Sequence, residues 1–130
     1  MSTSTPTNLK YSKTHEWVKI EGTNATVGIT HHAQEALGDI TFVELPKVGV
    51  TVKKAIACCV IESVKAASDI NAPVSGKVSE VNETLETAPE SVNGDPYGAG
   101  WIFKLTNINT ADAAGLMDAK AYEAFVESDQ

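Results

Sequence analysis

The chain has 130 residues, of which 42% are hydrophobic and 21% are charged, and its formal net charge is −7. This length and composition predict one soluble globular domain with a single hydrophobic core. The negative charge disfavours nucleic acid as a partner, and no apolar stretch reaches the length needed to span a membrane.

The N-terminal eight residues are polar and contain neither an apolar run nor an arginine-rich amphipathic pattern. We expect residues 1–8 to form a short disordered lead without signal or transit function, and residues 9–130 to form the domain. Cys58 and Cys59 are adjacent, so on a strand one thiol would enter the core and the other would face outward. A disulfide between sequence neighbours is strained, which predicts two free thiols in a reducing compartment, and hence a cytoplasmic protein.

The first half of the chain is expected to form short strands. A hairpin is predicted to join residues 17–21 to residues 25–29, and Thr30 can cap a short helix over residues 31–37 that ends at Gly38. Further strands are expected over residues 40–45, 50–52, 56–61, 68–72 and 77–82.

The second half is expected to contain a short helix over residues 84–90, a strand over 101–105 and a C-terminal helix over 119–127. Asp118 is the natural N-cap of the last helix, with Met117 and Tyr122 as a hydrophobic staple. Many short strands separated by glycine and proline turns indicate a β-sandwich or a small barrel decorated by short helices.

Several motifs lack the context that catalysis or metal binding requires. The glycines of residues 94–100 precede a strand instead of opening a helix, so they indicate a tight loop and not a dinucleotide site. His31 and His32 point about 100° apart on a helix and are expected to be solvated, and His15 lacks the second histidine of a zinc-protease helix. No nucleophile and base can be paired, so we expect neither a catalytic site nor a metal site.

Lys65 lies in the turn Ser63-Val64-Lys65-Ala66, between a strongly β-forming run and a weaker extended one. Such a turn would project the Lys65 side chain from a hairpin tip. The alanines that follow leave room for the cleft of another protein to close over this tip.

An amine at such a position has two chemical uses. A Schiff-base nucleophile must be neutral, but an unperturbed lysine with a pKa of about 10.4 is neutral in roughly one molecule in 2,500 at pH 7. Burial or a neighbouring cation would have to lower that pKa, and a hairpin tip close to Glu62 offers neither. Acylation by an external enzyme requires only exposure, so we expect Lys65 to carry a covalently attached group.

The segment around Lys65 resembles the lipoyl-attachment segment of the glycine cleavage system H-protein family, with ESVKAASD at residues 62–69 and APVSG at 72–76. Other stretches resemble the family in the same order: THEWV (14–18), VGIT (27–30), AQ (33–34), LGDI (37–40), VELP (43–46), VG (48–49), VNE (81–83), VN (92–93), DPYG (95–98) and GW (100–101). The resemblance extends from about residue 11 to residue 126. Each stretch is weak alone, and the ordered series is specific.

The resemblance implies a mainly β barrel-sandwich hybrid fold of the biotinyl/lipoyl-carrier type, with short peripheral helices and a C-terminal helix. It also implies that Lys65 carries lipoic acid in amide linkage, as N6-lipoyllysine. The chain would then be a non-catalytic shuttle that takes an aminomethyl group from glycine decarboxylase, a pyridoxal phosphate enzyme, to aminomethyltransferase, which uses tetrahydrofolate. Dihydrolipoyl dehydrogenase would reoxidise the carrier with its FAD. We expect a monomer, because a shuttle serves several enzymes in turn.

Glu62 and Gly49 are expected contacts of the lipoate ligase or octanoyl/lipoyl transferase that modifies Lys65. Each also has a simpler interpretation, Glu62 as a solvated charge and Gly49 as a turn glycine with positive φ. The loaded arm is expected to rest against the domain surface, which would protect a hydrolysis-prone group. The adjacent cysteines stand where the family would be expected to have small or aliphatic residues, and strand packing tolerates them.

Other functions remain open at this point. A biotin carrier would show methionine on both sides of the lysine, where this chain has Val64 and Ala66. A lipoyl domain of a 2-oxoacid dehydrogenase would usually have an aspartate before the lysine. An H-like protein that relays lipoate or has a regulatory role fits the same residues.

Overall fold

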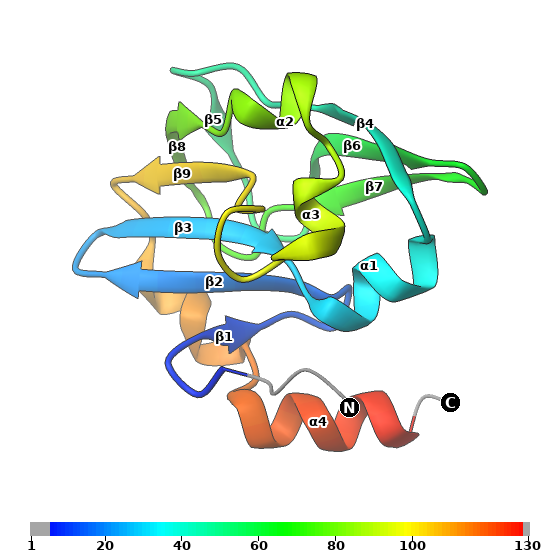
Figure 1. Ribbon diagram of the computed structural model, residues 1–130. Coiled ribbons are helices and arrows are strands. Elements are labelled where there is room, and N and C mark those ends of the chain that lie inside the picture. Colours follow the sequence, from blue (N-terminus) through cyan, green and yellow to red (C-terminus); the bar gives the residue numbers. More distant parts are fainter. Residues whose placement is uncertain (1–5, 129–130) are drawn as a thin grey trace.

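The structure is a computed structural model that describes residues 6–128 (Figure 1). The predicted lead, residues 1–8, therefore falls largely outside the described residues. The elements in chain order are β1 (Lys10–Tyr11), β2 (Glu16–Glu21), β3 (Asn24–Ile29), α1 (His31–Leu37), β4 (Ile40–Glu44), β5 (Thr51–Val52), β6 (Ala57–Ser63), β7 (Ala67–Asn71), β8 (Gly76–Val81), α2 (Thr84–Thr87), α3 (Ser91–Gly94), β9 (Phe103–Thr106), a 3₁₀ helix η1 (Thr110–Gly115) and α4 (Ala119–Ser128).

The strands form two antiparallel sheets. One sheet has six strands in the order β1-β2-β3-β9-β8-β5, and the other has three in the order β4-β6-β7. Their inner faces share one core, to which the first sheet contributes residues such as Val27 and Phe103 and the second contributes Val43 and Ile61, all at most 1% exposed. The predicted mainly β fold, a sandwich or small barrel with short helices, is confirmed.

Local sequence signals explain how several elements begin and end. The register Glu21↔Asn24 leaves Gly22 and Thr23 as a two-residue hairpin loop, and Gly22 adopts the positive φ of 66° that such loops favour. Thr30 accepts a hydrogen bond from Ala33 N (3.2 Å), as expected of an N-cap. Asp118 does the same for Ala121 N (2.8 Å) ahead of α4.

The helix expected over residues 84–90 is present but ends early: α2 covers only Thr84–Thr87, and a separate single-turn helix, α3, begins at Ser91. Pro89 lies between them, and a proline both lacks an N–H and disfavours the helical conformation in the residue before it. Ala88 accordingly has φ −135° and ψ 62°. The strand expected over residues 101–105 begins later, at Phe103, and β1 and η1 had no clear pattern in the sequence.

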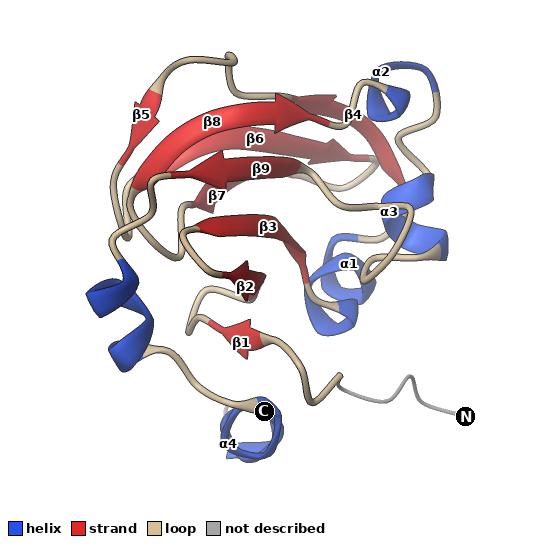
Figure 2. Cartoon of the chain, turned by 90° about the vertical axis from the view of Figure 1, so that its left-hand side faces the viewer, coloured by secondary structure: helices blue, strands red, loops and turns tan. Residues whose placement is uncertain are grey.

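The C-terminal helix packs on the edge of the six-stranded sheet. Figure 2 shows α4 end on, beneath β1 and outside the two-sheet body. A second buried cluster of Leu9, Tyr11, Trp17, Ala119 and Tyr122 fills this interface, and Met117 packs against it. The predicted staple residues therefore both lie in the cluster that holds α4. No helix within residues 6–128 is long and apolar enough to cross a membrane.

The adjacent cysteines divide between core and surface as expected. Cys59 is buried in the core, whereas Cys58 is half-buried and donates to the Ile70 carbonyl at 3.4 Å. Both are free thiols. A hydrogen bond with Cys58, together with burial, raises the pKa of Cys59, so this thiol is a poor nucleophile.

Candidate functional site

Lys65 lies in the turn that joins β6 to β7, and this hairpin projects beyond the rest of the molecule in Figure 1. Ser63 N donates to Ala66 O (2.8 Å), which closes the turn around Val64 and Lys65. The Ser63 hydroxyl accepts from Lys65 N and from Ala66 N, both at 3.2 Å. The predicted four-residue turn is confirmed, and Lys65 is exposed on it.

A second contact fixes the turn from the side. Val64 N donates to Asp39 O (3.0 Å), in the short connection between α1 and β4. Gly38, the preceding residue, has φ 82°, and a Cβ added there would lie 3.1 Å from Lys65 Cε. The aliphatic part of Lys65 therefore lies over a backbone position that only glycine leaves open.

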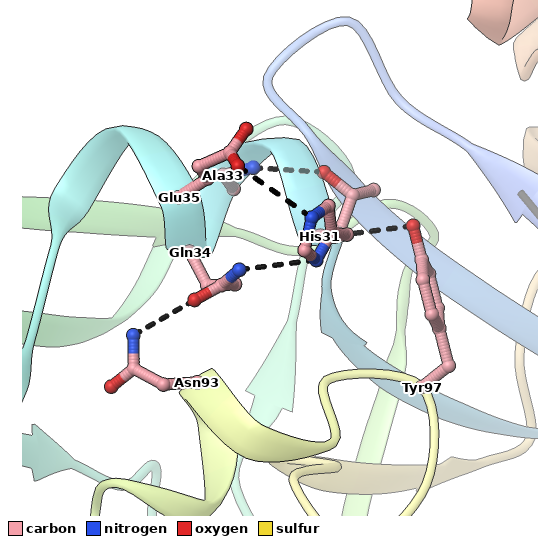
Figure 3. Close-up of polar contacts among 7 residues, drawn as sticks. His31, Ala33, Gln34, Glu35, Asn93 and Tyr97 are labelled. Atoms are coloured by element: carbon pink, nitrogen blue, oxygen red, sulfur yellow. Dashed lines mark hydrogen bonds and ion pairs between the residues drawn. The ribbon is translucent and has the colours of Figure 1, made fainter. Parts of the chain in front are cut away.

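A polar network holds this connection in place, and Figure 3 shows the part of it that runs from Asn93 through Gln34 to His31. The Asn93 side chain donates to Gln34 Oε1 (2.9 Å) and Gly38 O (2.8 Å), and accepts from Ile40 N (2.9 Å). It thus joins the end of α1 and the start of β4 to α3. Gln34 in turn contacts His31 Nδ1 (3.1 Å).

His31 is more constrained than the sequence interpretation allowed. It lies half-buried, with its Nε2 3.8 Å from the Glu35 carboxylate, and its backbone N–H donates to the Tyr97 hydroxyl (3.0 Å). The expectation of a solvated helix start is therefore wrong for His31. The sequence indicated this constraint on His31 only indirectly, because its partner Gln34 and the next residue in the network, Asn93, both lie in stretches that resemble the family.

The structure brings Glu62 close to the lysine turn and places Gly49 elsewhere. Glu62 lies on β6 opposite Phe42 and Ala67 and is exposed. Gly49 has φ 95° and donates its N–H to Val78 O (2.8 Å), in the connection from β4 to β5. That connection lies at the opposite end of the molecule from the β6–β7 turn (Figure 1).

A buried carboxylate forms a feature that sequence reasoning missed. Glu16 is 1% exposed and accepts hydrogen bonds from the hydroxyls of Ser12 and Thr14 and from Asn71 N (3.1 Å). Burial raises the pKa of Glu16, and these hydrogen bonds oppose part of that rise.

Glu16 lines an open cavity of about 330 Å³ at the far end of β7. Lys13, Lys54, Ala72 and Leu116 also line it, so the wall combines apolar surface with cations and one deep carboxylate. Residues 14–18 (THEWV) resemble the family, but nothing in their pattern indicates that Glu16 is buried beside a cavity.

Comparison with known proteins agrees with this architecture. A family model described as glycine cleavage H-protein matches residues 9–129. The glycine cleavage system H protein of Laribacter hongkongensis is 59% identical over 119 residues, covering 91% of this chain and 94% of that protein. That of Cronobacter sakazakii is 57% identical over 125 residues, covering 95% and 97%.

A solved structure shows the same fold. The crystal structure of a glycine cleavage system H protein from Mycobacterium marinum matches with a TM-score of 0.84 and 39% identity, covering 92% of this chain and 96% of that one. The two sheets and their helices are therefore the barrel-sandwich hybrid that the resemblance implied. Sequence and structure agree over nearly the whole length, and the chain belongs to the glycine cleavage H-protein family.

Proposed function

We propose that Lys65 carries lipoic acid in amide linkage and that the chain is the carrier component of the glycine cleavage system. The observation that carries this proposal is an exposed lysine on the projecting β6–β7 turn of a member of this family. No carboxylate within residues 6–128 forms an ion pair with its amine. The amine is therefore available to an acylating enzyme.

Attachment requires little from the chain beyond presenting this amine. The neutral Lys65 Nζ attacks the carboxyl carbon of an activated acyl donor, loses one proton as the amide forms, and displaces adenylate in a ligase or a carrier thiol in a transferase. The exposed Ala66 and Ala67 add no bulk around the amide. When bound, the lipoyl group supplies a dithiolane that takes up and releases a one-carbon unit.

The proposed partners follow from this role. They are glycine decarboxylase, aminomethyltransferase, dihydrolipoyl dehydrogenase, and a lipoate ligase or octanoyl/lipoyl transferase. Glu62 lies close to the turn, and this position supports the proposal that it contacts the attaching enzyme. Gly49 belongs to the proposal as a second contact, which requires an enzyme that reaches the opposite end of the molecule.

We place the resting position of the arm along β7, directed at the Glu16 cavity. β7 begins two residues after Lys65 and ends at Asn71, which donates to Glu16. At about 3.3 Å per residue its five residues span about 17 Å, a length that an extended lipoyl-lysine side chain approaches. The buried Glu16 carboxylate can bind a cationic amine on the arm, because a nearby positive charge favours the ionised form of the carboxylate.

Intact-mass analysis of protein from the native host, followed by peptide mapping, tests the attachment. We expect a lipoyl mass increase on Lys65 and activity in glycine–bicarbonate exchange with purified glycine decarboxylase. Lys65→Arg should abolish both, whereas Lys77→Arg, a matched exposed lysine on β8, should change neither. Exchange supported by unmodified protein would contradict the proposal.

The relay alternative makes a different prediction in the same assay. A relay protein would be lipoylated on Lys65, would transfer the group to other lipoyl proteins, and would not support exchange. Exchange activity of the lipoylated chain therefore separates the two functions.

A further inference from the structure

The outer face of the three-stranded sheet carries a defined set of exposed side chains beside the lysine turn. In antiparallel strands, residues directly opposite each other share a face. Register places Phe42, Glu62 and Ala67 in one row, and Glu44, Val60 and Asp69 in the row two residues further from the turn. The alternate row, Val43 and Ile61, points into the core. We call these six outward residues the acidic sheet face.

The acidic sheet face has an aromatic side chain that the fold does not use. Phe42 is 47% exposed and is the one aromatic ring among the large exposed hydrophobic side chains of residues 6–128. Val64, 68% exposed, continues the apolar surface at the turn. Aromatic side chains, including phenylalanine, are enriched at the centre of protein–protein interfaces, so Phe42 is a candidate anchor for a partner.

The charge of this face has one sign. Glu44, Glu62 and Asp69 are exposed on it, and β4, β6 and β7 contain no lysine, arginine or histidine. A surface of this kind attracts a basic partner and repels an acidic one, including another copy of a chain with net charge −7.

We propose that the acidic sheet face is the docking surface for the enzyme that acylates Lys65, and that this enzyme presents a basic surface with an apolar pocket for Phe42; the inference rests on the proposed function. The enzyme must bring its acyl donor to bonding distance of Nζ, so it has to cover the turn and the strands beside it. Enzymes that act on the dithiolane meet it at the end of a long arm and need not touch this face. An activated acyl donor such as an adenylate is anionic, so the attaching enzyme needs cations at its active site. Further cations around the mouth of that site would face the three carboxylates.

The test uses the unmodified full chain with a lipoate ligase, ATP and lipoate, and follows acylation of Lys65 by intact mass. Two variants probe the face: Phe42→Ala and the double variant Glu44→Lys/Asp69→Lys. The matched control is Glu21→Lys/Glu123→Lys, exposed positions on the β2–β3 hairpin and on α4. Each substitution adds two charges, so both double variants have a formal net charge of −3 instead of −7. Circular dichroism and thermal unfolding first establish that all variants fold.

We expect each face variant to raise the KM for the chain by about tenfold with little change in kcat, whereas the control stays close to the wild type. The wild-type KM should rise with salt, and this dependence should weaken in Glu44→Lys/Asp69→Lys.

Equal KM values for the face variants and the control would overturn the proposal. So would a normal acylation KM combined with impaired glycine–bicarbonate exchange by the lipoylated face variants, because the face would then serve glycine decarboxylase. Failure of the proposed function gives a different result, namely wild-type chain that is not acylated on Lys65 at all.

Discussion

Gly38 has φ 82° and ψ −156°, a backbone region that is essentially restricted to glycine. We predict that Gly38→Ala destabilises the chain by about 1–3 kcal/mol through backbone strain. The added Cβ would also meet Lys65 Cε at 3.1 Å, so the lysine stem must move and acylation of Lys65 should slow. Urea unfolding and the acylation rate measure the two effects.

Gly22→Ala and Gly49→Ala are matched controls for the strain. Both glycines have positive φ, and a Cβ at either position meets nothing within 4 Å. Gly22→Ala should lose stability without slower acylation, and slow acylation of Gly49→Ala would support its contact with the attaching enzyme. If Gly38→Ala and Gly22→Ala are acylated equally fast, the contact between Gly38 and Lys65 has no role.

The buried carboxyl of Glu16 predicts a pH dependence of stability. Burial raises its pKa above the usual value of 4.5, so as pH rises the unfolded chain loses this proton before the native state does. The contribution of Glu16 to stability is therefore greatest at acid pH, falls as pH rises from about 4.5 through the native pKa, and is constant above it. We predict that the free energy of unfolding of the wild type, minus that of Glu16→Gln, decreases from pH 4 to pH 8.

Urea unfolding of both proteins across this range measures the difference, with Glu21→Gln on the same strand as the exposed control. A difference that stays constant would show that Glu16 titrates alike in both states. Glu16→Gln also tests the proposed resting position of the arm. It should shorten the lifetime of the aminomethyl group carried on the lipoyl arm, and it should leave the rate of Lys65 acylation unchanged.

At the scale of elements, Tyr122 links α4 to the body of the protein through both polar and aromatic contacts. The Tyr122 hydroxyl contacts His15 Nδ1 and Thr30 Oγ1, each at 2.7 Å, and its ring stacks on Tyr11 with centroids 4.8 Å apart. Burial raises the pKa of Tyr122 to about 12, so the phenol remains protonated at neutral pH. His15 has φ 72°, and this contact helps to hold that unusual backbone conformation.

We predict that Tyr122→Phe destabilises the chain by about 1–3 kcal/mol, because buried Thr30 loses a hydrogen bond while the ring stacking remains. Tyr97→Phe removes one hydrogen bond to the backbone of His31 and should cost less, about 0.5–1.5 kcal/mol. Urea unfolding at pH 7 compares the two, and an equal loss would argue against a special role for Tyr122.

The elements that sequence predicted best are those with local signals. Thr30, Asp118 and the Gly22 loop act on their own neighbours, so their caps and turn could be placed without a structure. Pro89 was also a local signal and was given too little weight. The bounds of β9 depend on its pairing with β3 and β8, which the local sequence does not contain.

The residues of the candidate site also divide into those with a local sequence signal and those brought together only by the fold. Lys65 could be identified because a turn between two β runs is a local pattern, and the resemblance added its chemistry. The Glu16 cavity joins residues 12–16 to residues 54–55, 71–73 and 115–116, and the Asn93 network joins three elements. Such sites arise only from tertiary contacts, so spacing along the chain could not reveal them.

At the scale of the whole molecule, we predict a monomer in a cytoplasm-like, reducing buffer. The net charge of −7 opposes self-association, and the free thiols Cys58 and Cys59 are buried or half-buried. Sedimentation equilibrium should give 13.8 kDa at both low and high salt. A dimer that persists in high salt would contradict this prediction. It would indicate that the exposed Phe42 belongs to a dimer interface and not to the docking surface for the acylating enzyme.

The β6–β7 turn is held by backbone and hydroxyl contacts on two sides, from Ser63 and from Asp39. A group attached to Lys65, as proposed, would therefore swing from a fixed pivot, and its distal end would reach positions up to one arm length from the turn. The loop would contribute no extra reach, so each of the proposed partner enzymes would have to bring its reactive centre within that radius. With the turn fixed by four hydrogen bonds, the length of the arm alone would limit how deep the active site of a partner enzyme can lie.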